Sequence, residues 1–254
     1  MNVPMNHFKQ ALREERPLLG FWNSIGAPAI TEILADAGID WILIDTEHAP
    51  NELPTVVHQL RALTGSASTP VVRPAWNDPV LIKRILDLGV QSLLIPYVQS
   101  AQEAARAVAA TRYPPVGNRG VASVHRANRY GRVTDYFTRA NDQMCVIVQL
   151  ETPTALDALE SIATVDGLDG VFIGPSDLAA SLGHPGDARH PDVRAAIDAA
   201  CRRARAIRIP IGILSPLEDD AKHFLEIGFT FVAIGSDIVT LRRGVDGIVQ
   251  QFRR

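Results

Sequence analysis

The sequence predicts a single α/β domain over residues 1–254, folded as a (β/α)8 TIM barrel. Short apolar runs alternate with helical patterns from one end of the chain to the other. Each run is rich in Val, Ile and Leu and lacks polar alternation, which is typical of a parallel strand buried on both faces. A length of 254 residues with no break in composition suits one closed barrel. An open doubly wound sheet is the alternative fold.

Eight strands are predicted, over residues 18–22, 41–45, 70–73, 92–96, 145–150, 170–174, 209–214 and 231–235. Between them, apolar residues spaced by three and four predict helices over 29–37, 53–63, 80–88, 101–110 and 193–207. Gly38, Gly89 and Gly228 each stand between a helical pattern and the next strand, where a glycine ends a helix well. The longest irregular stretch, 113–130, predicts a functional loop or an interface element.

Composition narrows the classes of function. A net charge of -3 and a pI near 6.2 provide no basic surface for nucleic acid or an anionic membrane. No segment has the roughly 20 apolar residues that a membrane span requires. Cys145 and Cys201 lie within apolar or helical patterns, so we expect buried thiols and no disulfide framework. These features predict a soluble cytoplasmic protein.

In a barrel of this kind, the active site lies at the carboxyl ends of the strands. Glu151 follows the fifth predicted strand, and Asp177 follows the sixth in a Gly-Pro turn. Two carboxylates from adjacent strand ends suit a hard divalent cation with positions left open for substrate. The alternative is that each residue only begins a helix, where acidic side chains are common.

Two further strand ends carry residues suited to catalysis. His48 follows the second strand on a loop, and its ordinary pKa suits general acid–base work. Arg73 ends the third strand and must find an anionic partner. That partner is either Asp45, in a structural ion pair, or the negative charge that develops on a substrate. The two roles are compatible.

The chain contains only three lysines, Lys9, Lys83 and Lys222, and none follows a predicted strand. Schiff-base chemistry needs a desolvated lysine aimed into the mouth of the barrel. The positions of these lysines therefore disfavour that chemistry, and carbonyl activation by a metal ion is the expectation.

Several strings of residues occur in an order that resembles the HpcH/HpaI aldolase family. The resemblance extends from Gly20 to about Asp246 and rests on Asp45-Thr46-Glu47-His48-Ala49-Pro50-Asn51, Val72-Arg73-Pro74, Tyr113-Pro114-Pro115, Arg119-Gly120-Val121, Gln149-Leu150-Glu151-Thr152 and Gly174-Pro175-Ser176-Asp177-Leu178. The family resemblance implies a class II pyruvate aldolase that uses Mg²⁺, Mn²⁺ or Co²⁺.

The resemblance also implies roles for individual residues. Glu151 and Asp177 would be the metal ligands, His48 the acid–base residue, Asp87 the carboxylate that orients His48, and Arg73 the residue that steadies the enolate oxygen. The predicted substrate-binding residues are Trp22, Asp45, Gln149, Pro175, Ser176 and Leu214. Of these assignments, the role of Asp87 depends on the resemblance alone, since its helix pattern otherwise indicates a solvated residue.

The predicted reaction is reversible cleavage of a 4-hydroxy-2-oxo acid into pyruvate, or a close analogue, and an aldehyde, through an enolate that stays on the metal. Oxaloacetate decarboxylation or another carbon–carbon reaction of the pyruvate enolate is the alternative, and a non-catalytic binding barrel is a more remote one. The resemblance further implies a homohexamer, a trimer of dimers, in which neighbours exchange the last helix.

Overall fold

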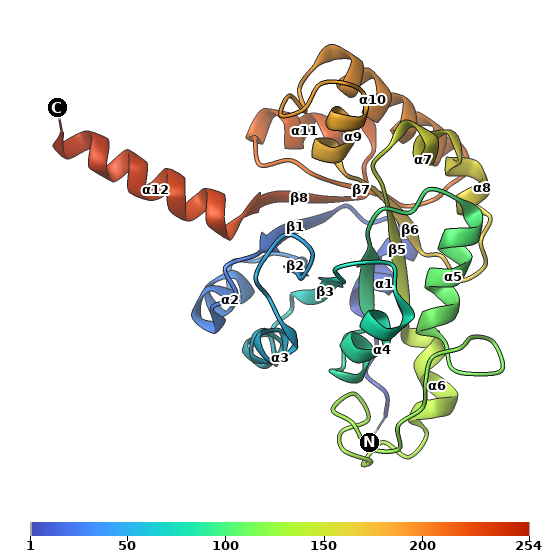
Figure 1. The fold of residues 1–254 in the computed structure, drawn as a ribbon. Coiled ribbons are helices and arrows are strands. Elements are labelled where there is room, and N and C mark those ends of the chain that lie inside the picture. The colour runs from blue at the N-terminus through green and yellow to red at the C-terminus, as the bar shows by residue number, and fades with distance from the viewer. Residues whose placement is uncertain (1, 254) are drawn as a thin grey trace.

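The computed structural model describes residues 2–253 as a closed barrel of eight parallel strands in sequential order, which confirms the predicted fold (Figure 1). The strands are β1 (Leu18–Asn23), β2 (Trp41–Asp45), β3 (Thr69–Arg73), β4 (Ser92–Ile95), β5 (Cys145–Leu150), β6 (Gly170–Ile173), β7 (Ile211–Leu214) and β8 (Phe231–Ser236). β8 pairs with β1 and closes the barrel, so the doubly wound alternative is wrong.

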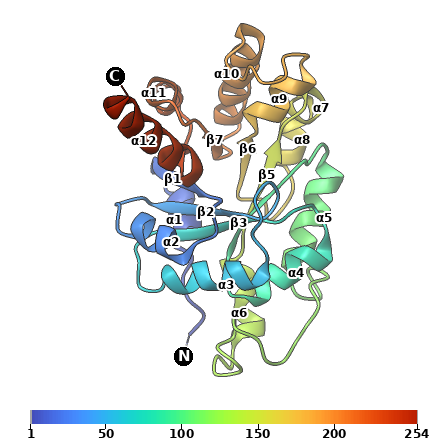
Figure 2. The ribbon, with the colours of Figure 1, turned by 60° about the vertical axis from the view of Figure 1, so that its left-hand side comes forward.

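The chain also forms helices, most of which lie in an outer layer around the strands (Figures 1 and 2). They are α1 (His7–Arg13), α2 (Pro28–Ala35), α3 (Leu53–Ala62), α4 (Pro79–Asp87), α5 (Ala101–Thr111), α6 (Tyr136–Gln143), α7 (Pro153–Asp157), α8 (Leu159–Ala163), α9 (Pro175–Ser181), α10 (Pro191–Ala206), α11 (Glu218–Ile227) and α12 (Asp237–Phe252). The five helices expected from apolar spacing are α2, α3, α4, α5 and α10. The patterns did not single out α1, α6 or α8, because helices of five to eight residues are too short to display a clear period.

Large side chains fill the inside of the barrel at its amino end. Phe8 from α1 packs against Trp41 and Phe231, with ring centroids 5.7 and 5.8 Å apart. Gly20 makes room for this layer, since a Cβ there would lie 2.0 Å from the Trp41 ring. With its amino end filled and capped by α1, the interior of the barrel opens toward the carboxyl ends of its strands.

The predicted irregular stretch is a loop between α5 and α6, at the amino end of the barrel. Its Arg119 is fully buried, donates to Asp87 Oδ1 at 2.8 Å and stacks over the Tyr113 ring. His125 in the same loop packs edge-on against Tyr136. The loop is therefore part of the core of this end and lies away from the predicted site. Cys145 and Cys201 are both buried free thiols, as predicted.

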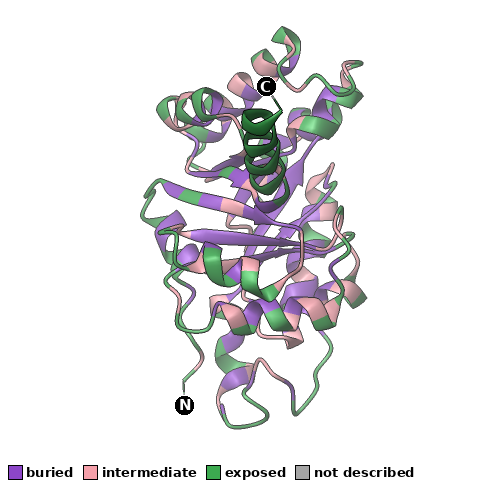
Figure 3. Cartoon of the chain, turned by 90° about the vertical axis from the view of Figure 1, so that its left-hand side faces the viewer, coloured by how far each residue is buried: buried purple, intermediate pink, exposed green. Residues whose placement is uncertain are grey.

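Helix α12 leaves the barrel instead of covering it (Figures 1 and 3). Asp237 is its one buried residue among those described, and the rest of the helix projects into solvent. The outward-facing side chains of Leu19 on β1 and Ile234 on β8 consequently stay more than a third exposed. Within residues 2–253, no helix combines the length and the apolar character needed to span a membrane.

Candidate active site

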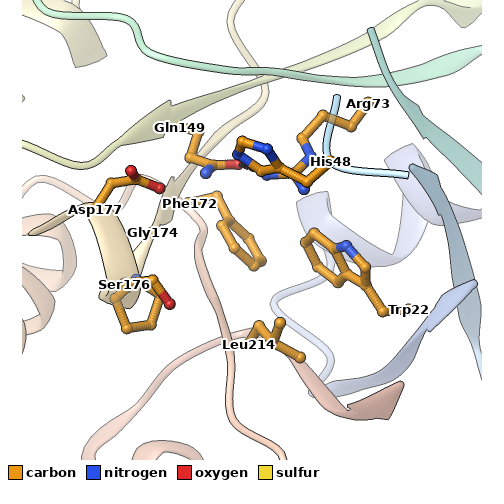
Figure 4. A pocket seen from close by; sticks show the side chains of 10 residues that line it. Trp22, His48, Arg73, Gln149, Phe172, Gly174, Ser176, Asp177 and Leu214 are labelled. Atoms are coloured by element: carbon orange, nitrogen blue, oxygen red, sulfur yellow. Dashed lines mark hydrogen bonds between the residues drawn. The ribbon is translucent and has the colours of Figure 1, made fainter. Parts of the chain in front are cut away.

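A small cavity of about 120 Å³ opens at the carboxyl ends of the strands (Figure 4). Its lining residues are Trp22, His48, Arg73, Gln149, Phe172, Gly174, Pro175, Ser176, Asp177 and Leu214. The apolar side chains of Trp22, Phe172 and Leu214 form one wall and the polar side chains the other. This volume is about that of four water molecules, which suits a small organic acid and is far too small for a nucleotide.

Arg73 is the most firmly held polar group of the site. Its Nε donates to Asp45 Oδ1 at 2.9 Å and its Nη2 to Asp45 Oδ2 at 2.6 Å, while its Nη1 lies 2.8 Å from Glu47 Oε2. The expected ion pair with Asp45 is thus confirmed. Burial raises the pKa of Asp45, but the hydrogen bonds and charge of Arg73 outweigh it and leave that pKa below its ordinary value. Asp45 also accepts from Trp22 Nε1 at 3.3 Å, so it fixes two walls of the cavity at once.

Glu47 is a site residue that the sequence analysis did not assign. Burial raises its pKa to about 7, which the charge of Arg73 opposes and the nearby carboxylates of Asp45 and Asp177 reinforce. Its position directly before His48, in the loop that follows β2, was the one feature of the sequence that could have indicated a place in the site. The sequence alone did not indicate which side chain of the strand-end loop would turn onto Arg73.

Glu151 lies at the end of β5 and is almost completely buried. Its Oε2 accepts from Gln149 Nε2 at 2.7 Å, and its Oε1 accepts from the backbone N–H of Tyr97 at 2.8 Å. Gly174 allows this placement, because a Cβ there would lie 2.6 Å from Glu151 Oε2. Burial, reinforced by the nearby carboxylates of Asp177 and Glu47, raises the pKa of Glu151 to about 7 in spite of these two hydrogen bonds.

Asp177 belongs to the first turn of α9, and its exposed carboxylate points toward the cavity (Figure 4). Together with Glu151 it forms an all-oxygen donor pair of the kind that Mg²⁺ and Mn²⁺ prefer. The carboxylates of Asp45 and Glu47 add to the negative charge around the single guanidinium of Arg73. A divalent cation would relieve this excess of negative charge, so the residues present fit the metal that the sequence predicts.

The structure brings His48 to the mouth of the cavity but does not bring Asp87 to it. The side chain of His48 is 64% exposed, and its Nε2 lies 3.8 Å from Glu47 Oε2. Asp87 ends α4 at the amino end of the barrel, where it pairs with Arg119. Among the described residues of one chain, Asp87 therefore does not orient His48. Within one chain the two side chains lie apart because α4 runs back along the barrel and carries its last residue to the opposite end, so the role of Asp87 stays a prediction.

Replacing Glu151 by glutamine is expected to stabilise the metal-free protein at about pH 7.5 but not at about pH 5. The folded chain holds the proton of Glu151 more tightly than the unfolded chain, since its pKa is raised from 4.5 to about 7. The stability contributed by this proton is complete below the unfolded pKa and is lost as the pH rises through the folded one. Glutamine mimics the protonated form, so urea unfolding in EDTA should yield a gain of about 1–3 kcal/mol at the higher pH.

The matched control for this experiment is Glu226→Gln, which alters an exposed carboxylate on α11. Its unfolding curve should not change at either pH. Equal stability of the wild-type and Glu151→Gln proteins at about pH 7.5 would show that burial of this carboxylate carries no cost.

Comparisons with known proteins match almost the whole chain. The profile of the HpcH/HpaI aldolase/citrate lyase family matches residues 18–243. A 5-keto-4-deoxy-D-glucarate aldolase of Salmonella arizonae is 50% identical over 249 residues, which cover 98% of this chain and 97% of that protein.

Two solved structures also match over nearly the whole chain. A crystal structure of an HpcH/HpaI aldolase/citrate lyase family protein from Burkholderia cenocepacia has a TM-score of 0.95 at 41% identity, covering 98% of this chain and 100% of its own. An HpcH/HpaI aldolase from Desulfitobacterium hafniense has a TM-score of 0.89 at 27% identity, covering 97% and 96%.

Proposed function

Because the chain belongs to the HpcH/HpaI aldolase/citrate lyase family, as its resemblance predicted, we propose that it is a divalent-metal-dependent aldolase acting on 4-hydroxy-2-oxo acids. The observation that carries the proposal is the cavity itself. Its lining includes Asp177 on α9, Arg73 on β3 and Gln149 on β5, whose amide donates to the buried carboxylate of Glu151, and its volume fits a three-carbon acid.

The chemistry divides between the metal and the protein. A divalent cation held by Glu151 and Asp177 would supply Lewis-acid polarisation of the substrate's keto group. Arg73 stabilises the negative charge that develops on the same oxygen as the carbon–carbon bond breaks, and its ion pairs keep it preorganised for that charge. The N–H groups of Ser176 and Asp177 lie in the first turn of α9, where a helix has no internal partner for them, and they would hold the substrate carboxylate.

The relatives suggest the substrate. In 5-keto-4-deoxy-D-glucarate, counting from the keto end, a carboxylate, a 2-oxo group, a methylene and a 4-hydroxyl follow one another. His48 takes the proton of that hydroxyl at the mouth of the cavity, and the bond between the methylene and the hydroxyl-bearing carbon breaks. Protonation of the remaining enolate carbon yields pyruvate. The other product is a three-carbon aldehyde that carries a hydroxyl and a carboxylate, so the atoms balance.

The test is pyruvate release from 5-keto-4-deoxy-D-glucarate and other 4-hydroxy-2-oxo acids, followed with lactate dehydrogenase. Release should stop in EDTA and return when Mg²⁺, Mn²⁺ or Co²⁺ is restored. Release that EDTA does not affect would overturn the metal site. Carbon dioxide formed from oxaloacetate, with no pyruvate from any hydroxy-oxo acid, would favour the decarboxylase alternative. Tight binding without turnover would favour a non-catalytic barrel.

The proposed functional unit is a homo-oligomer in which α12 packs on a second copy of the chain, as in the hexamer that the family resemblance implies. The supporting observation is the apolar stripe of α12, whose exposed members are Ile238, Leu241, Val245, Ile248, Val249 and Phe252. An exposed stripe of this size on a projecting helix is costly in water. The uncovered Leu19 and Ile234 on the adjoining strands provide a second apolar surface that an exchanged helix would bury.

Leu241→Asp is expected to shift the protein to smaller species in sedimentation velocity. The new carboxylate would be buried where α12 packs on the second copy of the chain, which costs free energy. Gln250→Asp, which adds the same charge on the opposite face of α12, is the control and should leave the sedimentation coefficient unchanged. Sedimentation of the wild-type protein as a monomer at micromolar concentration would overturn the proposed exchange.

A further inference from the structure

Outside the active-site cavity, two histidines and an aspartate meet on the segment that joins α9 to α10. His184 and His190 are half-buried, and Asp192 lies in the first turn of α10. None of the three lines the cavity. Among residues 2–253 they form the one group of three or more His, Cys, Asp or Glu side chains whose ligand atoms all lie within 4.8 Å of one another.

The distances within this cluster match the spacing of ligands around a small metal ion. Asp192 Oδ2 lies 3.2 Å from His184 Nε2 and 3.6 Å from His190 Nδ1. Ligands bound at the usual 2.0–2.1 Å in tetrahedral geometry are about 3.3 Å apart. To bind one ion, the two imidazole rings, which stack with planes at 14°, must turn so that their in-plane lone pairs converge between the three ligand atoms.

The protonation states that the contacts require also favour a cation. The two imidazole rings stack with centroids 3.4 Å apart and planes at 14°, so two imidazolium ions would repel each other strongly there. The backbone N–H of Asp192 donates to His190 Nδ1 at 3.3 Å, which places a lone pair on that nitrogen. An ion bound through Nδ1 would replace this long hydrogen bond, and it would be shared with Asp192 Oδ2, which lies 3.6 Å from the same nitrogen.

The surrounding contacts hold the segment in place before any ion binds. Arg189, next to His190, lies 3.3 Å from Asp220 of α11, and Arg194 pairs with the same carboxylate. Two glycines with positive φ, Gly183 and Gly186, form the turns that bring His184 back toward His190. Preorganisation of this kind lowers the conformational cost of binding.

We propose that His184, His190 and Asp192 form a second metal site, selective for a divalent transition metal such as Zn²⁺. Two imidazoles and one carboxylate favour Zn²⁺, Ni²⁺ or Cu²⁺ over Mg²⁺, and the fourth position is left to water. The bound ion ties the start of α10 to the segment that follows α9. The site does not depend on the proposed aldolase function, because it shares no ligand with Glu151 and Asp177.

The test is the stoichiometry of Zn²⁺ bound to the full-length protein after EDTA treatment, measured by equilibrium dialysis and elemental analysis. In a Glu151→Gln, Asp177→Asn background, which removes the predicted active-site ligands, one equivalent per chain should remain. Adding His184→Gln or His190→Asn should abolish it. Asparagine still provides a side-chain acceptor for the first turn of α10, so the second substitution tests the ligand rather than the helix.

His223→Gln is the matched control, because His223 pairs with Asp198 through its Nε2 at 3.4 Å and has no second histidine beside it. That variant should retain the bound Zn²⁺, and Zn²⁺ should raise the Tm of every variant that keeps the cluster. Retention of the full equivalent in both His184→Gln and His190→Asn would refute the site. Absence of any bound Zn²⁺ in the double-substituted background would refute it as well.

Discussion

Asp177→Ala is expected to lower kcat/KM by about a thousandfold or more, since a lost metal ligand removes several kcal/mol of transition-state stabilisation. Asp177 is exposed and is not part of the hydrophobic core, so the fold should persist. Titration calorimetry with Mn²⁺ should show that binding at the cavity is lost in parallel with pyruvate release. Because a carboxylate in the first turn of a helix also interacts with the helix dipole, the experiment needs a control for that effect alone.

Asp219→Ala provides this control. Asp219 is an exposed acidic residue in the first turn of α11, so its loss has a similar effect on a helix dipole but removes no predicted ligand. Its activity and Mn²⁺ affinity should match those of the wild type. Equal activity losses in the two variants, with Mn²⁺ binding intact, would mean that Asp177 only stabilises its helix.

Arg73→Lys is expected to lower kcat by about a hundredfold or more while changing KM much less, because the lost interaction is strongest in the transition state. The guanidinium of Arg73 contacts Asp45 through two nitrogens and Glu47 through the third. An ammonium group preserves the charge, but it cannot satisfy this planar arrangement and also point at a substrate oxygen. Single-turnover measurements would assign the loss to the chemical step.

Arg106→Lys is the matched control for the same substitution. Arg106 lies on α5, is 60% exposed, and pairs only loosely with Glu103 at 3.6 Å. Its kinetics should be those of the wild type. If Arg73→Lys retained the wild-type kcat, a positive charge alone would be sufficient at this position, and the requirement for a planar guanidinium would be refuted.

The alternation of apolar runs and helical patterns was enough to predict every strand of the barrel to within two residues at either end. It was also enough to place His48, Arg73, Glu151 and Asp177 on one rim. Both predictions rest on local chemistry. A strand buried on both faces must be apolar throughout, and in this fold the residue that follows each strand necessarily emerges at the same end of the barrel.

Other features depend on how the barrel closes. Glu47 contacts Arg73, and Arg73 lies 3.5 Å from Gln149, which is 76 residues away along the chain. Asp87 resembles a site residue in its sequence string, yet α4 carries it to the opposite end of the barrel. The sequence therefore determined which residues reach the rim, since that depends on neighbours along the chain. Only the tertiary structure decided which of them touch and which carboxylates are buried, because those contacts form between segments that the closed barrel brings together.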